Sequence, residues 1–176
     1  AFIFAGSTFP KGYSSETGAD MLLTNAAADI NKPRGSLESL DDVTAIFKAQ
    51  PKETMLNFLK ASIKTNKEET EDIKKLHQAY SDGRFEELIP LLEETEQRTL
   101  KLVDTKYAKA MSDWLKNDLL IRRNLAWLHE IRKQSAKQST LFAVGIAHLP
   151  SEKGLIELLR QEGYQVTPEP KVLIWQ

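Results

Sequence analysis

Leu141-Phe-Ala-Val-Gly-Ile-Ala-His148 is the stretch of sequence that decides the predicted fold. Its first five residues, Leu141 to Gly145, are apolar or small and show no polar alternation, which is typical of a strand buried on both faces. A short loop that carries His148 follows this strand. Because open α/β sheets usually bind ligands beyond the carboxyl ends of their strands, His148 is the first candidate for a functional residue.

The residues beyond this loop predict an amphipathic helix and a second strand. Ser151 is expected to cap the helix, and an apolar stripe runs from Leu155 to Leu159. Gly163 suits the left-handed conformation that commonly ends a helix, so residues 164–167 are expected to return as the next strand.

The remainder of the chain predicts a large helical block and two further short strands. Ala1 to Ala5 and Arg34 to Glu38 are read as the strands, and helical spacing of apolar residues extends from Glu71 to about Lys137, with a break at residues 81–83 and another near Pro90. We therefore predict an α/β (α+β-like) fold in a single domain over residues 1–176. Its small, mostly parallel sheet of about three to four strands would be covered by a large helical insertion.

Composition excludes several classes of function. The 176 residues carry 24 basic and 25 acidic side chains, a net charge of −1, so there is no basic excess that would favour a nucleic-acid partner. The absence of cysteine excludes disulfides, thiolate metal sites and cysteine nucleophiles. No apolar run approaches the ~20 residues that a membrane-spanning helix needs, so we expect no transmembrane segment.

Four groups of residues recur in the order and spacing of a known family. The first is Gly145-x-x-His148-Leu-Pro, followed by a helix that ends in Leu-Arg and by Gly163-Tyr-x-Val. The others are Gly18-x-Asp, Lys32-Pro33 followed by Leu37-Glu38, and Arg123-Asn124 followed by Ala126-Trp127. This pattern resembles the TraB/GumN family, which is related to the pheromone-shutdown proteins and the Tiki metalloproteases.

The chain departs from that pattern in two places. The family carries a first Gly-x-x-His motif near its N-terminus, and no such motif occurs here. The residue before the arginine–asparagine pair is often acidic in the family, whereas here it is Arg122. The chain therefore looks like roughly the C-terminal two-thirds of such a domain, without its N-terminal part.

The resemblance implies a site composed of distant residues. It implies that His148 and Glu38 hold a divalent metal such as manganese, that Arg123 and Asn124 position the substrate or the carboxylate, and that Gly145 lets the substrate approach. Each residue also has a structural interpretation that the sequence leaves open. His148 can bond a loop carbonyl, Glu38 can favour a helix N-terminus, and Arg123 can form an ion pair. Asn124, a mediocre helix former within a helical pattern, is expected to make a tertiary hydrogen bond.

By the same resemblance, we expect a metal-dependent hydrolase that acts on peptide bonds. Two alternatives stay open: a non-catalytic protein that binds or sequesters peptides, and an inactive fragment of a larger enzyme. The expected partner is a peptide or small-molecule ligand, and an exposed strand edge would favour a homodimer. Bacterial relatives are often exported or membrane-anchored, which favours the periplasm, although the sequence leaves the cytoplasm open.

Overall fold

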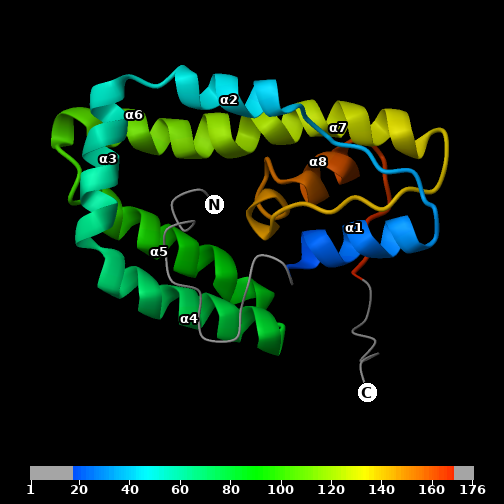
Figure 1. The fold of residues 1–176 in the computed structure, drawn as a ribbon, viewed down its shortest axis with the longest axis horizontal. Helices are drawn as coiled ribbons and strands as arrows, with labels where there is room; N and C mark the ends of the chain where they lie inside the picture. The colour runs from blue at the N-terminus through cyan, green and yellow to red at the C-terminus, as the bar shows by residue number, and fades with distance from the viewer. Residues whose placement is uncertain (1–17, 169–176) are drawn as a thin grey trace. The chain divides into compact units, whose positions relative to one another are not determined.

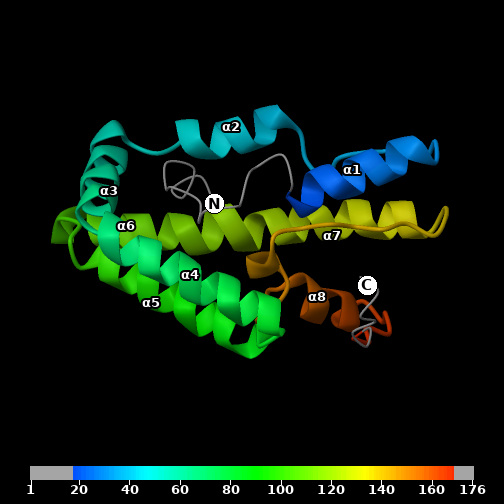
Figure 2. The same ribbon diagram turned by 60° about the horizontal axis from the view of Figure 1, so that its bottom comes forward.

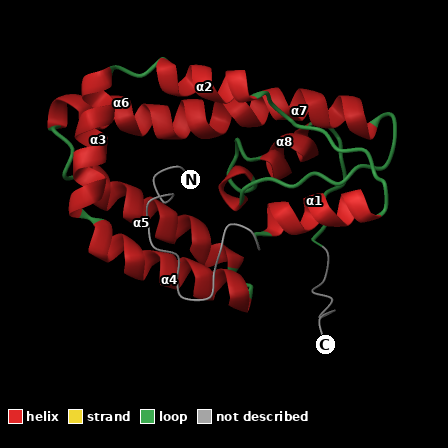
Figure 3. Ribbon diagram, in the orientation of Figure 1, coloured by secondary structure: helices red, strands yellow, loops and turns green. Residues whose placement is uncertain are grey.

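The computed structural model describes residues 18–168 of the chain, and contacts divide it into two compact units. The first unit extends to Leu119 and the second begins at Leu120. Within the described residues every regular element is a helix, as Figure 3 shows. None of these helices has both the length and the apolar composition needed to cross a bilayer.

The prediction of an α/β fold with a parallel sheet is therefore wrong. Residues 34–38, 141–145 and 164–167, three of the predicted strands, contain no strand in the structure, and Ala1 to Ala5 lies outside the described residues. The physical reason is that an apolar run becomes a strand only when a neighbouring segment pairs with its backbone N–H and C=O groups. Within residues 18–168 no segment supplies that pairing. Whether residues 1–176 form a single domain stays a prediction.

The first unit consists of α-helices joined by short connections (Figure 1). In chain order they are α1 (Ala19–Asp29), α2 (Leu40–Lys48), α3 (Lys52–Lys64), α4 (Asn66–Asp82), the 3-10 turn η3 (Phe85–Glu87), α5 (Leu88–Leu100) and α6 (Thr105–Asp113). Local chemistry fixes several of their ends. Ser39 begins α2 with a reciprocal capping box, in which its hydroxyl accepts from the Asp42 N–H at 3.1 Å and its own N–H donates to the Asp42 carboxylate at 2.9 Å. Gly83 ends α4 in the left-handed conformation, at the predicted break.

The core of the first unit lies among α3, α5, α6 and the residues that follow α6. Its buried apolar side chains are Phe58, Ala61, Leu100, Val103, Met111 and Trp114. The ring of Trp114 meets Phe47 of α2 edge to face, with centroids 5.2 Å apart, and its indole N–H donates to the Ile46 carbonyl at 3.4 Å. These contacts attach α2 to the helical block.

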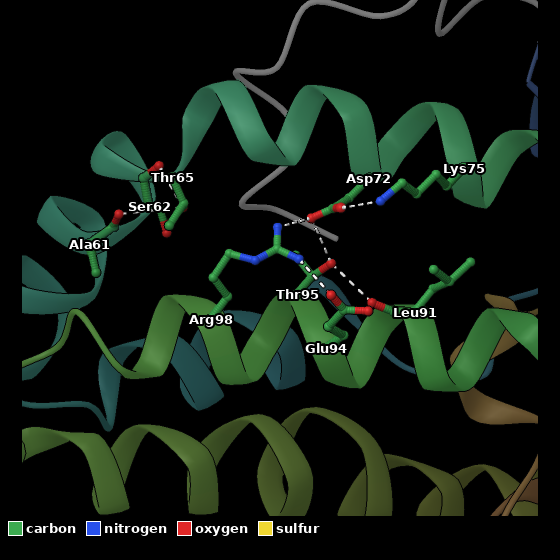
Figure 4. Close-up of polar contacts among 9 residues, drawn as sticks. All are labelled: Ala61, Ser62, Thr65, Asp72, Lys75, Leu91, Glu94, Thr95 and Arg98. Atoms are coloured by element: carbon green, nitrogen blue, oxygen red, sulfur yellow. Dashed lines mark hydrogen bonds and ion pairs between the residues drawn. The ribbon is translucent and has the colours of Figure 1, made fainter.

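A buried polar cluster also joins α4 to α5, as Figure 4 shows. Asp72 of α4 is only 4% exposed, and its carboxylate accepts from Thr95 at 3.1 Å and from Arg98 at 2.5 Å. Arg98 also donates to Glu94 at 3.1 Å. A buried carboxylate is tolerated only when such partners replace its hydration, so the cluster fixes the register of the two helices.

The second unit contains α7 (Arg122–Ser135), the 3-10 turn η5 (Ile146–His148) and α8 (Leu155–Gln161), all visible in Figure 2. A π-helical stretch, η4 (Trp114–Ile121), precedes α7 in the chain. Helix α7 packs against α8, and the buried apolar side chains of the pair are Trp127, Leu128, Ile131, Leu155 and Leu158.

The two ends of α8 test two predictions from the sequence. Gly163 has a φ of 87° just beyond the helix, and the N–H groups of Gly163 and Tyr164 return to carbonyls of its last turn, so the predicted left-handed end is confirmed. The prediction that Ser151 caps the helix is wrong. The N-cap is Gly154, and Ser151 lies in a turn with a φ of 81°.

Candidate functional site

His148 lies at the end of η5 and packs against the first turns of α7. Its side chain is nearly buried, at 7% exposure, and its Nδ1 lies 2.7 Å from the Oδ1 of Asn124. Its backbone N–H donates to the Gly145 carbonyl at 2.9 Å, which closes the 3-10 turn. The predicted candidates His148, Asn124 and Gly145 are therefore neighbours within the second unit.

Asn124 defines the protonation pattern of this imidazole. The Asn124 Nδ2 lies 2.8 Å from the Lys153 carbonyl and 3.3 Å from the His148 carbonyl. Because both carbonyls only accept hydrogen bonds, the amide nitrogen must face them, and the amide oxygen must face the imidazole. An amide oxygen is also only an acceptor, so Nδ1 of His148 carries the proton and donates. In the neutral ring Nε2 is then the acceptor.

The same amide holds both ends of the loop that follows His148. Asn124 is 2% exposed, and it bonds to backbone at residues 148 and 153 as well as to the imidazole. The expectation that an asparagine inside a helix makes a tertiary hydrogen bond is confirmed. This one side chain therefore sets the shape of the loop and the orientation of the ring.

Arg123 lies on the other side of the imidazole. Its Nη1 is 3.4 Å from Nε2 of His148, so the guanidinium donates to the one ring nitrogen that accepts. The guanidinium carbon also lies 4.7 Å from the centre of the Trp127 ring, in cation–π geometry. Arg123 as a whole residue is half-buried.

Trp127 also belongs to the site, and sequence reasoning did not place it there. Its ring centroid lies 4.4 Å from that of His148, so the indole supports both the imidazole and the guanidinium. The tryptophan is buried, at 5% exposure. The available signal was spacing, because residues 123, 124 and 127 share one face of a helix.

Two glycines shape the backbone around the imidazole. A Cβ atom at Gly154 would lie 1.9 Å from the Pro150 carbonyl oxygen, so only glycine fits where the loop meets α8. At Gly145 a Cβ atom would meet only the imidazole Cδ2, at 3.8 Å, and otherwise open space. Whether a ligand approaches the ring at Gly145 stays a prediction from the sequence.

Glu38 belongs to the first unit, where it is half-buried, so its predicted pairing with His148 stays a prediction. Among the side chains that the structure describes, which leave out residues 66–70 and 85, no group of three His, Asp or Glu residues is arranged to hold a metal ion. Of the two predicted ligands, His148 has its Nδ1 2.7 Å from Asn124 Oδ1 and its Nε2 3.4 Å from Nη1 of Arg123. A metal-binding histidine typically donates its other N–H to a neighbouring group, as Nδ1 does to Asn124.

Comparison with family models decides the relationship that the sequence motifs suggested. Residues 4–168 match the model of the TraB/PrgY/gumN family. The chain belongs to this family. Comparisons with curated proteins and with solved structures found no match. The predicted family is therefore confirmed over nearly the whole chain, and this TraB/PrgY/gumN domain carries its Gly-x-x-His motif on the turn that presents His148.

Proposed function

We propose that this TraB/PrgY/gumN domain hydrolyses peptide bonds, with Nε2 of His148 acting at the reacting centre. The observation that carries the proposal is the 2.7 Å hydrogen bond from Nδ1 of His148 to Asn124. It holds the neutral ring in the tautomer whose Nε2 has a lone pair. That lone pair is needed by a metal ligand and by a general base alike.

The family resemblance implies a bound metal ion, and the second unit offers one ring nitrogen of the right chemistry to bind it. Nε2 of His148 would be a ligand, and Asn124 would orient the ring through Nδ1. That Glu38 is a second ligand is implied by the family resemblance alone. A bound divalent cation such as manganese would supply Lewis-acid activation of the attacking water. Arg123, half-buried above the Trp127 ring, would hold a carboxylate of the substrate.

The test combines metal binding with turnover. Manganese binding to the full chain is measured by calorimetry, and cleavage of a mixed peptide pool is followed by mass spectrometry with and without chelator. His148→Ala should abolish both signals. His129→Ala, which removes an exposed histidine of the same helix α7, should change neither. Equal metal binding by the wild type and His148→Ala would remove the metal assignment.

A second candidate function is peptide binding without turnover. The contact between Arg123 and Nε2 of His148 favours it, because the guanidinium donates to the same lone pair that a cation would use. In that case the guanidinium of Arg123 and the imidazole of His148 together recognise a carboxylate or a peptide carbonyl. Peptide binding that resists chelator, with no cleavage products after prolonged incubation, would favour this candidate over hydrolysis.

A further inference from the structure

Helix α3 of the first unit presents large apolar side chains to solvent. Leu56, Leu59 and Ile63 follow one another at three- and four-residue spacing, so they form one stripe along the helix. Leu56 is 42% exposed, Leu59 is 48% exposed and Ile63 is 76% exposed. These three residues are called the outer stripe below.

The opposite face of α3, which contacts α4, α5 and α6, is built mostly from small or polar side chains. Its buried residues are Thr54, Phe58, Ala61 and Ser62, and only Phe58 among them is large and apolar. A surface helix normally buries its large apolar residues and exposes its polar ones. Because α3 departs from this pattern, packing of the first unit does not account for the outer stripe.

Lysines flank the outer stripe. Lys52, Lys60 and Lys64 are exposed and lie three or four residues from members of the stripe, so they share its side of the helix. Glu53 is the one acidic residue exposed on α3. None of the three lysine side chains forms an ion pair with any residue that the structure describes. This side of α3 is therefore positively charged, although the whole chain carries a net charge of −1.

We propose that the outer stripe and its lysines bind a membrane surface that contains anionic lipid. The leucine and isoleucine side chains enter the boundary of the acyl chains, and the ammonium groups contact the phosphate and carboxylate groups of the lipids. Helix α3 has 13 residues, about 20 Å at 1.5 Å per residue, which is shorter than the ~30 Å hydrocarbon core of a bilayer. The helix therefore lies in the plane of the interface. Membrane binding by α3 is independent of peptide hydrolysis at His148.

The charges on α3 favour lipid over a second copy of the chain or another protein. If the outer stripes of two copies paired, the lysines of the two helices would approach one another and repel. A protein partner that covered the stripe would remove water from the ammonium groups, and lysine is depleted from protein–protein interfaces for this reason. At a lipid surface the flexible lysine stem keeps the ammonium group among hydrated headgroups while its carbon atoms cover apolar surface.

The test measures binding of the full chain to vesicles by flotation. One set of vesicles contains equimolar phosphatidylcholine and phosphatidylserine, and the other contains phosphatidylcholine alone. Lys60→Gln removes one flanking charge, and Ile63→Gln removes one apolar side chain of the stripe. Lys101→Gln and Leu40→Gln are the matched controls, because they make the same changes at exposed positions outside α3. Circular dichroism checks that each variant is folded.

We expect the wild type to bind the anionic vesicles and to bind the neutral ones at least about tenfold more weakly, because the neutral surface does not attract the lysines. Lys60→Gln should weaken binding to anionic vesicles about fivefold, the contribution of one lysine near such a surface. Ile63→Gln should weaken it about tenfold or more, since a polar side chain replaces buried apolar area. Both controls should bind within about twofold of the wild type. Added salt should weaken binding.

Three results would overturn membrane binding by α3. The first is a wild type that does not bind the anionic vesicles, or that binds both kinds of vesicle equally. The second is equal loss of binding in Ile63→Gln and Leu40→Gln, which would place the contact outside the outer stripe. The third comes from sedimentation without lipid: a dimer that Ile63→Gln dissociates would assign the stripe to a second copy of the chain. A monomer that does not bind vesicles would leave a protein partner as the occupant and refute the lipid.

Discussion

Replacing Asn124 by alanine should destabilise the second unit by about 3 kcal/mol. The substitution removes three hydrogen bonds at once, to Nδ1 of His148 and to the carbonyls of His148 and Lys153. Each intramolecular hydrogen bond contributes about 1 kcal/mol net, and a buried group left without a partner costs about 1–3 kcal/mol. Since Lys153 is exposed, its carbonyl can bond to water, whereas the nearly buried His148 cannot fully recover its loss.

The assay is equilibrium unfolding in urea, followed by circular dichroism, together with the thermal midpoint. For a chain of this length, a loss of about 3 kcal/mol lowers the midpoint by about 6–12 °C. Asn117→Ala is the matched control, because it makes the same change at an exposed position and should cost less than about 0.5 kcal/mol. If Asn124→Ala unfolds within about 1 kcal/mol of the wild type, the amide does not hold this loop.

Three other substitutions test separate parts of the structure. Gly154→Ala should lower the free energy of unfolding by about 2 kcal/mol or more, because its Cβ would overlap the Pro150 carbonyl. It should also shift the amide signals of the His148 loop in NMR spectra. The control Gly35→Ala, whose Cβ meets nothing within 4 Å, should have neither effect. Asp72→Asn should lower the free energy of unfolding in urea by about 1–3 kcal/mol. The loss is smaller than for a fully buried ion pair, because the Arg98 side chain is 31% exposed and keeps some hydration. A variant as stable as the wild type would show that the buried polar cluster does not join α4 to α5. Burial raises the pKa of the Glu96 carboxyl, so the folded state binds its proton more tightly than the unfolded state, and stability falls as pH rises from the ordinary value of 4.5 through the raised one. Glu96→Gln should therefore be more stable than the wild type at pH 7 and lose that advantage at pH 4, and an advantage independent of pH would refute this origin.

Local chemistry made the helical part of the fold predictable from the sequence. The break at Gly83 and the end at Gly163 depend on the freedom of glycine to adopt a positive φ. Each of these signals is contained within a few neighbouring residues, and each was found in the structure.

The errors arose where the outcome depends on residues far apart in the sequence. Leu141 to Gly145 has the composition of a buried strand, but a strand also needs a paired neighbour, and none lies within residues 18–168. Ser151 has the side chain of a helix cap, yet the loop held by Asn124 makes Gly154 the N-cap. In both cases the local sequence has the residue types that the predicted element needs, but distant parts of the chain determine a different structure.

The candidate site was predictable in part for the same reason. The family motifs identified Arg123, Asn124 and His148, and the structure brings these three together. The contacts of the Trp127 ring with the imidazole and the guanidinium were missed, because the helical spacing of residues 123, 124 and 127 shows a shared face but not which distant ring packs against it. The roles of these residues in chemistry stay predictions, as does the participation of Glu38.

The most direct test of the central claim is a measurement of the His148 tautomer by nitrogen-15 NMR of the imidazole in the full chain. At neutral pH we predict that Nδ1 carries the proton and that Nε2 shows the shift of an unprotonated ring nitrogen, because the Asn124 oxygen accepts from Nδ1. In Asn124→Ala this preference should weaken. A wild-type ring that is protonated at Nε2, on its own or together with Nδ1, would contradict the account.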